Sequence, residues 1–60
     1  MLIEFITLDG KFEKIDTNKL YGTAVFTQKP PTRKKYAEMQ LNLLKEKFKA
    51  GMIKGYKVIE

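Results

Sequence analysis

The sequence predicts an α+β fold in which a small antiparallel sheet, in the order ββ(β)αβ, is packed by one helix in the C-terminal half. Asp9-Gly10 lies between two segments rich in β-branched and aromatic residues, which is typical of a hairpin. Good helix formers run from Thr32 to about Ala50, and apolar and polar residues alternate again after Gly51. The chain has 60 residues and no internal repeat. We therefore expect residues 1–60 to form a single domain.

The first expected element is a hairpin of residues 2–8 and 11–16, for which side-chain chemistry selects between two registers. A two-residue Asp9-Gly10 turn would create three poor cross-strand pairs: Ile3 with Asp16, Glu4 with Ile15 and Phe5 with Lys14. A three-residue loop of residues 8–10 creates three favourable ones: Ile3 with Ile15, Glu4 with Lys14 and Ile6 with Phe12. We predict the second register, with Gly10 at positive φ in a bulge.

Residues 16–18 are expected to form a turn, followed by a third strand over residues 20–28, which are rich in strand formers. A helix is the alternative, because Leu20, Tyr21, Ala24 and Val25 also fit helical spacing and Asp16 or Thr17 would cap it. Gly22 and two Thr residues disfavour that helix. Lys29-Pro30-Pro31 then ends the element and holds the connection extended.

The helix predicted over residues 32–50 begins at Thr32, which can cap it, and ends at Gly51. Its apolar residues follow helical spacing and form one stripe, expected to lie on the sheet: Ala37, Leu41, Leu44 and Phe48. Residues 56–60 alternate and are expected to form a short final strand at an edge of the sheet.

The residue types in the chain argue against catalysis. There is no His, Ser or Cys, which removes the commonest general base near neutral pH and two of the usual nucleophiles. Four carboxylates lie close in sequence, and we expect them to form ion pairs on a solvated hairpin: Glu4, Asp9, Glu13 and Asp16. Asp9-Gly10 lacks the alternating ligands of a calcium loop. We predict no enzyme, no cofactor, no metal site and no small-molecule substrate.

The absence of Cys excludes disulfides and fits a reducing compartment, so we expect a cytoplasmic location. No apolar run reaches the roughly 18 residues of a membrane span, and residues 1–4 lack the features of a signal peptide. A chain of this size buries only about 60% of its unfolded surface, and dimerisation is a usual source of additional stability.

The positive charge of the chain is concentrated in its second half. Residues 1–30 carry four Lys and four acidic residues, whereas residues 31–60 carry eight basic residues and three Glu, for a net charge of +5. This asymmetry favours a polyanionic partner, although a solvated helix face would also contain many lysines. Because eleven of the twelve basic residues are Lys, phosphate contact is favoured over base-specific reading.

The start of the predicted helix is the most unusual part of this charge pattern. Arg33, Lys34 and Lys35 occupy its first turn, where the helix dipole makes each cation unfavourable by about 0.3 to 1 kcal/mol. Cations beside free helix amides are suited to binding phosphate. We therefore predict a nucleic-acid-binding module that uses the start and exposed face of helix 32–50, with these contact residues: Arg33, Lys34, Lys35, Lys45, Lys49, Lys54 and Lys57.

A second apolar stripe on the same helix predicts a protein interface: Tyr36, Met39 and Leu43. The predicted hairpin also has apolar side chains on both faces, so one small sheet cannot cover all of this apolar surface. The alternative function is a protein-binding adaptor or inhibitor, including a homodimer, of the kind that bacteriophages and mobile elements encode as short genes. Coverage of the stripe by the sheet and by Met52 and Ile53 is the structural alternative.

The expected topology is similar to that of some DNA-binding domains. A small antiparallel sheet packed by one helix occurs in some DNA-binding domains, such as the amino-terminal arm-binding domains of certain phage and transposon integrases, but this similarity is one of topology alone.

Binding to an anionic membrane surface is disfavoured, because the cations of the helix are not segregated opposite one large apolar face.

Overall fold

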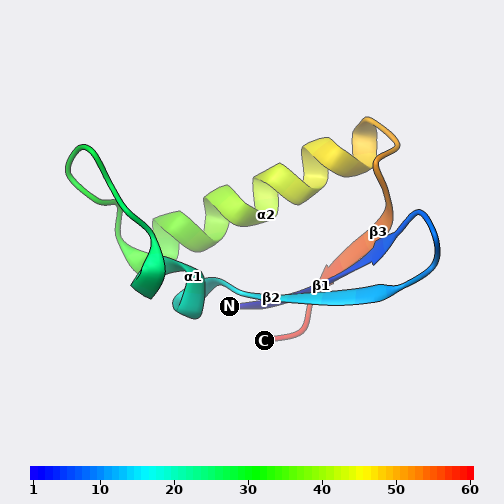
Figure 1. Cartoon of the computed structure of the whole chain (residues 1–60), viewed down its shortest axis with the longest axis horizontal. Coiled ribbons are helices and arrows are strands. Elements are labelled where there is room, and N and C mark those ends of the chain that lie inside the picture. Colours follow the sequence, from blue (N-terminus) through cyan, green and yellow to red (C-terminus); the bar gives the residue numbers. More distant parts are fainter.

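The computed structural model describes residues 1–60 as an α+β fold with a three-stranded antiparallel sheet and two helices (Figure 1). In chain order the elements are β1 (Leu2–Thr7), β2 (Phe12–Asp16), α1 (Thr17–Thr23), α2 (Arg33–Lys49) and β3 (Ile53–Val58). The strands lie in the order β2-β1-β3, so the first strand of the chain is central. α2 covers one face of the sheet (Figure 1).

The β1–β2 hairpin has the register that favourable side-chain pairing predicted. Ile3 lies opposite Ile15, Glu4 opposite Lys14 and Ile6 opposite Phe12. Gly10 has φ 87°, as the bulged loop requires. The side chain of Thr7 closes the loop by donating to Asp9 and by accepting from the amide of Lys11 at 3.1 Å.

The strand predicted over residues 20–28 is wrong, and so is the turn at residues 16–18. The chain instead enters α1 directly from β2, as in the helical alternative with Asp16 as cap. The carboxylate of Asp16 accepts from the amides of Asn18 and Lys19 at 3.0 and 3.4 Å. The buried hydroxyl of Thr17 donates to the carbonyl of Met1 at 3.0 Å, which ties the first turn to the sheet. These bonds outweigh the low helix propensity of Gly22 and Thr23, and residues 24–32 have no regular structure.

α2 has the predicted caps at both ends. The hydroxyl of Thr32 accepts from the amide of Lys35 at 3.1 Å, and Gly51 follows the helix at φ 75°. Ala37 and Leu44 are buried, Leu41 is half-buried against the sheet core, and Phe48 is 48% exposed. Leu41 and Leu44 therefore pack on the sheet as predicted, whereas Ala37 is buried outside this core cluster. Phe48 lies at the margin, where its ring meets Tyr56 edge-on at 5.8 Å.

β3 is an edge strand, as predicted, but it spans residues 53–58 rather than 56–60. Pairing starts earlier because Ile53 is drawn into the core and lies opposite Thr7, with a β-bulge between Ile6 and Thr7. Beyond β3, the amide of Ile59 still donates to the carbonyl of Leu2 at 2.8 Å. The two ends of the chain therefore lie side by side (Figure 1).

The core is small for a chain of this length. Ile3, Leu44 and Ile53 form a buried cluster, and five partly buried side chains pack against it: Met1, Phe5, Ile15, Leu41 and Tyr56. The accessible surface is 4660 Å², whereas roughly 4000 Å² is expected for a folded monomer of this mass. The molecule measures 36 × 21 × 15 Å, so the excess surface reflects a thin, elongated shape.

Candidate functional site

The three cations at the start of α2 have different surroundings. The guanidinium of Arg33 lies over the ring of Tyr21, 4.7 Å from its centroid, and donates to the carbonyl of Asn18 at 3.4 Å. Lys34 and Lys35 are exposed, and neither pairs with a carboxylate. No acidic residue lies in this first turn. Arg33 therefore helps to fix α1 to α2, whereas the two lysines project into solvent.

An aromatic cluster supports this end of the molecule. The rings of Tyr21, Phe26 and Tyr36 contact one another pairwise, with centroids 5.4 to 5.9 Å apart. The hydroxyl of Tyr21 donates to the carbonyl of Pro31 at 2.6 Å, which anchors the irregular segment to the helix. Tyr36 is half-buried in this cluster.

The second apolar stripe is thereby divided. Tyr36 is covered by the segment before α2, but Met39 and Leu43 remain 45% and 55% exposed. Neither the sheet nor the tail covers these two: Ile53 is buried in the core, and Met52 is itself 58% exposed. Met39 and Leu43 are the part of the predicted protein interface that is accessible.

The remaining predicted contact residues lie on two elements. Lys45 and Lys49 are exposed on α2, where Lys49 pairs with Glu46 at 3.9 Å. Lys54 and Lys57 are on β3, and Lys57 pairs with Glu4 at 3.7 Å. The predicted cations are thus brought together in part, with four exposed lysines sharing α2 and two projecting from the sheet edge.

Most of the positive charge lacks a carboxylate partner. Only three of the twelve basic side chains form an ion pair, at 3.7 to 3.9 Å. All eleven lysines are exposed. The pairs of Lys11 and Lys49 are exposed on both sides and are worth little individually, whereas Lys57 pairs with a Glu4 side chain that is only 18% exposed.

The four carboxylates near the start of the chain have separate roles. Asp9 lies in the hairpin loop with Lys11 and Thr7, Glu4 pairs with Lys57, and Asp16 caps α1. Glu13 lies on β2 with an exposed side chain. No three His, Cys, Asp or Glu side chains gather as metal ligands would. Neither helix is long and apolar enough to span a lipid bilayer.

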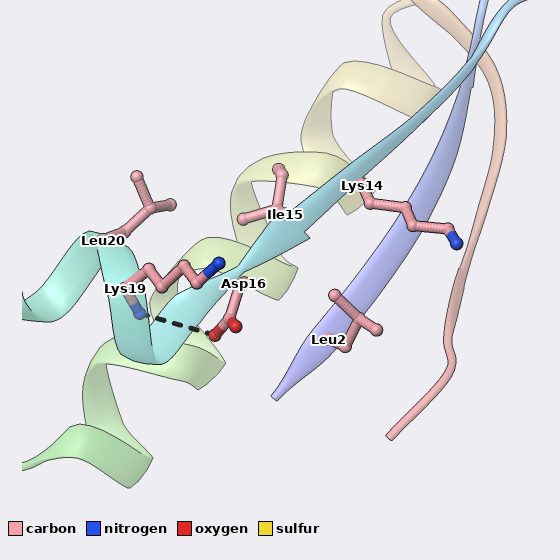
Figure 2. Close-up of a pocket in the computed structure, with 6 residues that line it drawn as sticks. All are labelled: Leu2, Lys14, Ile15, Asp16, Lys19 and Leu20. Atoms are coloured by element: carbon pink, nitrogen blue, oxygen red, sulfur yellow. Dashed lines mark hydrogen bonds between the residues drawn. The ribbon is translucent and has the colours of Figure 1, made fainter.

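Two open hollows lie beside the sheet, and neither was predicted from the sequence. The larger, of about 410 Å³, is formed where β1, β2 and α1 meet (Figure 2). Apolar side chains line it together with two lysines and the capping aspartate: Leu2, Ile15, Leu20, Lys14, Lys19 and Asp16. This hollow depends on α1, which supplies Lys19 and Leu20. The strand predicted over residues 20–28 therefore gave no indication of it.

The smaller hollow, of about 240 Å³, is on the sheet itself. Its lining comes from all three strands: Glu4, Ile6, Phe12, Gly55, Tyr56 and Lys57. Phe12 is 65% exposed, which is high for an aromatic side chain within a strand. Gly55 lies just before the predicted strand 56–60 but inside the observed β3. A Gly inside a strand marks a place that another group can approach closely, so the error in the strand boundary hid this signal.

Comparisons with known protein families, with curated proteins and with solved structures found no match to this chain.

Proposed function

We propose that this protein binds nucleic acid through the phosphate backbone, using the start and exposed face of α2. The observation that carries this proposal is the unneutralised positive charge of residues 31–60, where Lys49 and Lys57 alone among eight basic residues pair with a carboxylate. Such a surface attracts polyanions over a range set by ionic strength.

The position of the charge supports a role in binding rather than in stability. Lys34 and Lys35 stand in the first turn of α2, where the helix dipole opposes cations and neither has a compensating contact. The same dipole and the free amides of a first turn favour a bound phosphate. Lys45, further along α2, extends the exposed charge.

The chemistry of the cations favours binding that is independent of sequence. The single Arg lies over Tyr21 and donates to the carbonyl of Asn18, so a bidentate contact with a guanine would have to compete with these interactions. Lysines provide point charges without a fixed hydrogen-bonding geometry. Affinity should then depend strongly on salt and weakly on base sequence.

The test is fluorescence anisotropy with a labelled duplex and a labelled single strand over a series of salt concentrations. The variant Lys34→Gln/Lys35→Gln/Lys45→Gln retains Arg33, whose packing role would confuse the result. Its affinity should fall at low salt. For the duplex, the slope of log K against log salt should become shallower by about 0.9 for each phosphate that the variant no longer neutralises.

A charge control separates local contacts from the net charge of the molecule. Lys11→Gln/Lys29→Gln removes two charges from the half of the chain that has no net charge, and it is compared with Lys34→Gln/Lys35→Gln, which removes two charges from α2. The duplex affinity of this control should fall less than that of the α2 variant. Equal affinities for the two variants, or an α2 variant that binds as the wild type does, would show that α2 is not the contact surface.

A second candidate function, self-association, is favoured by the exposed face of α2. Along this face, opposite buried Ala37 and Leu44, the order of side chains is a cation, two apolar residues and an anion: Lys35, Met39, Leu43 and Glu46. This order is self-complementary, because two antiparallel copies of α2 would place Lys35 of one copy near Glu46 of the other and bury the apolar residues between them. The excess accessible surface of the monomer agrees with such a dimer.

A further inference from the structure

The face of the sheet opposite α2 is uncovered, and its side chains can be assigned from the strand register. Ile3 packs against Leu44 of α2, so the alternation of β1 places Leu2, Glu4 and Ile6 on the opposite, free face. Across the sheet, Ile6 lies between Phe12 and Gly55, and Glu4 lies between Lys14 and Lys57. The free face therefore carries an aromatic and aliphatic row beside a charged row.

The hollow on this face is open because Gly55 has no side chain. A Cβ added at Gly55 would meet no atom within 4 Å, so the space above Ile6 is unfilled. The ring of Phe12, 65% exposed, lies on the far side of Ile6 from Gly55. An exposed ring on a sheet beside an unfilled recess is the arrangement on which planar groups stack in single-strand-binding proteins.

Cations border both hollows. Lys57 lines the smaller hollow beside Glu4, with which it pairs at 3.7 Å. Lys14 and Lys19 line the larger hollow, where Leu2, Ile15 and Leu20 supply the apolar surface and the carboxylate of Asp16 is engaged in capping α1 (Figure 2). Lys14 and Lys19 have no carboxylate partner within ion-pair distance. An apolar recess with a flat ring and flanking lysines complements a nucleotide, which combines a planar base with an anionic phosphate.

We propose that the free sheet face binds single-stranded nucleic acid, with one base stacked on Phe12 in the recess beside Gly55 and with phosphates held by Lys14, Lys19 and Lys57. The inference rests on the proposed function and adds to it a substrate class, unpaired strands, and a second contact surface. A duplex cannot present the face of a base to this ring, because its bases are stacked on one another.

The test compares two fluorescent strands of equal charge, an oligothymidylate of about 12 nucleotides and an abasic strand of the same length, since binding sites of such proteins span about 4 to 16 nucleotides. The wild type should bind the oligothymidylate more tightly. Phe12→Leu should lower that affinity by roughly 5- to 160-fold, as expected for the removal of one stacked base. Affinity for the abasic strand should be unchanged.

Three more variants isolate the ring and the recess. Phe12→Tyr keeps a ring and should bind as the wild type does. Gly55→Val places a side chain in the recess, where its Cβ meets no atom within 4 Å, and replaces a poor strand former by a good one. It should therefore fold at least as stably and lose the preference for bases. Phe48→Leu removes a ring of similar exposure on the side of α2 and serves as the matched control.

The outcomes distinguish this inference from the proposed function. If the α2 lysine variant loses affinity while Phe12→Leu and Gly55→Val bind oligothymidylate normally, the stacking site is wrong and backbone binding by α2 stands. Equal wild-type affinity for oligothymidylate and the abasic strand also overturns the stacking site. Absence of wild-type binding to every strand and duplex would refute both proposals.

Discussion

Arg33, Lys34 and Lys35 carry the same charge in the same helical turn, yet their energetic roles differ. Arg33 lies over Tyr21, a cation–π contact worth about 0.5 to 1 kcal/mol at an exposed site. That gain is similar in size to the unfavourable dipole interaction of about 0.3 to 1 kcal/mol that each cation experiences in this turn. Lys34 and Lys35 experience the unfavourable interaction alone.

This difference predicts opposite effects on stability. Lys34→Gln should raise the free energy of unfolding by about 0.3 to 1 kcal/mol, because it removes a cation from the helix start. Arg33→Gln should leave it unchanged or lower it slightly, since this change also removes the cation–π interaction with Tyr21 and the hydrogen bond to Asn18. Urea denaturation measures both. A decrease in the stability of Lys34→Gln would contradict the assignment of this lysine to binding.

The sequence indicated which cations lie at the start of α2 but not which side chains they contact. The three basic residues and their unfavourable position follow from helix spacing and the capping Thr32 alone. The contact between Arg33 and Tyr21, and the half-burial of Tyr36, depend on the path of the irregular segment before α2. Long-range contacts of this kind leave no periodic pattern in a sequence.

Among the elements, the hairpin and α2 were predictable because local chemistry determines them. Cross-strand pairing selected the register, and Thr32 and Gly51 marked the helix ends. α1 was only the alternative to a strand, because residues 20–28 are rich in strand formers and because Gly22 and Thr23 disfavour a helix. It forms because Asp16, the last residue of β2, also caps the helix, and because Thr17 bonds to Met1 across the sheet.

The capping role of Asp16 can be tested at the level of the element. Asp16→Ala should lower the free energy of unfolding by about 0.5 to 2 kcal/mol and reduce helical circular dichroism, because the amides of Asn18 and Lys19 lose their acceptor. Asp16→Asn should retain most of the stability, since Asn is an equally good cap. Glu13→Ala, an exposed change on the same strand, is the control. Equal stability of Asp16→Ala and Glu13→Ala would refute the cap.

The two faces of the sheet have similar apolar content in the sequence. Apolar residues on both faces of the hairpin were evident from alternation, but the face that α2 covers was not. Packing of Ile3 against Leu44 decides it and leaves Ile6 and Phe12 on the opposite face, where Ile6 is half-buried and Phe12 is exposed. The recess at Gly55 then follows from the register of β1 with β3, which sets Gly55 opposite Ile6. This pairing is between segments near the two ends of the sequence and leaves no local signal.

The small core limits the stability of the whole molecule. Only five of 60 residues are buried, and ten large apolar side chains are exposed. A monomer with so little buried surface gains considerable stability from any partner that covers it. The exposed face of α2 leads us to expect a dimer, and measurement of the oligomeric state tests this expectation.

Sedimentation velocity over a range of concentrations should detect a dimer of the wild type, and Met39→Gln/Leu43→Gln should remain monomeric. Met52→Gln, another exposed methionine outside α2, should associate as the wild type does. Lys35→Glu alone should weaken the dimer, and Lys35→Glu/Glu46→Lys should restore it, because the exchanged charges would again face each other. A wild type that stays monomeric at every concentration would refute self-association through α2.

The central position of β1 affects how the chain acquires its structure during synthesis. Of these five elements β1 leaves the ribosome first, but β3, its other neighbour in the sheet, is made about 50 residues later. The hairpin can close early, whereas the cluster of Ile3, Leu44 and Ile53 needs residues from both ends of this segment. Folding to the packed state is thus delayed until β3 is released, and the nascent chain exposes the apolar side chains of β1 throughout that interval.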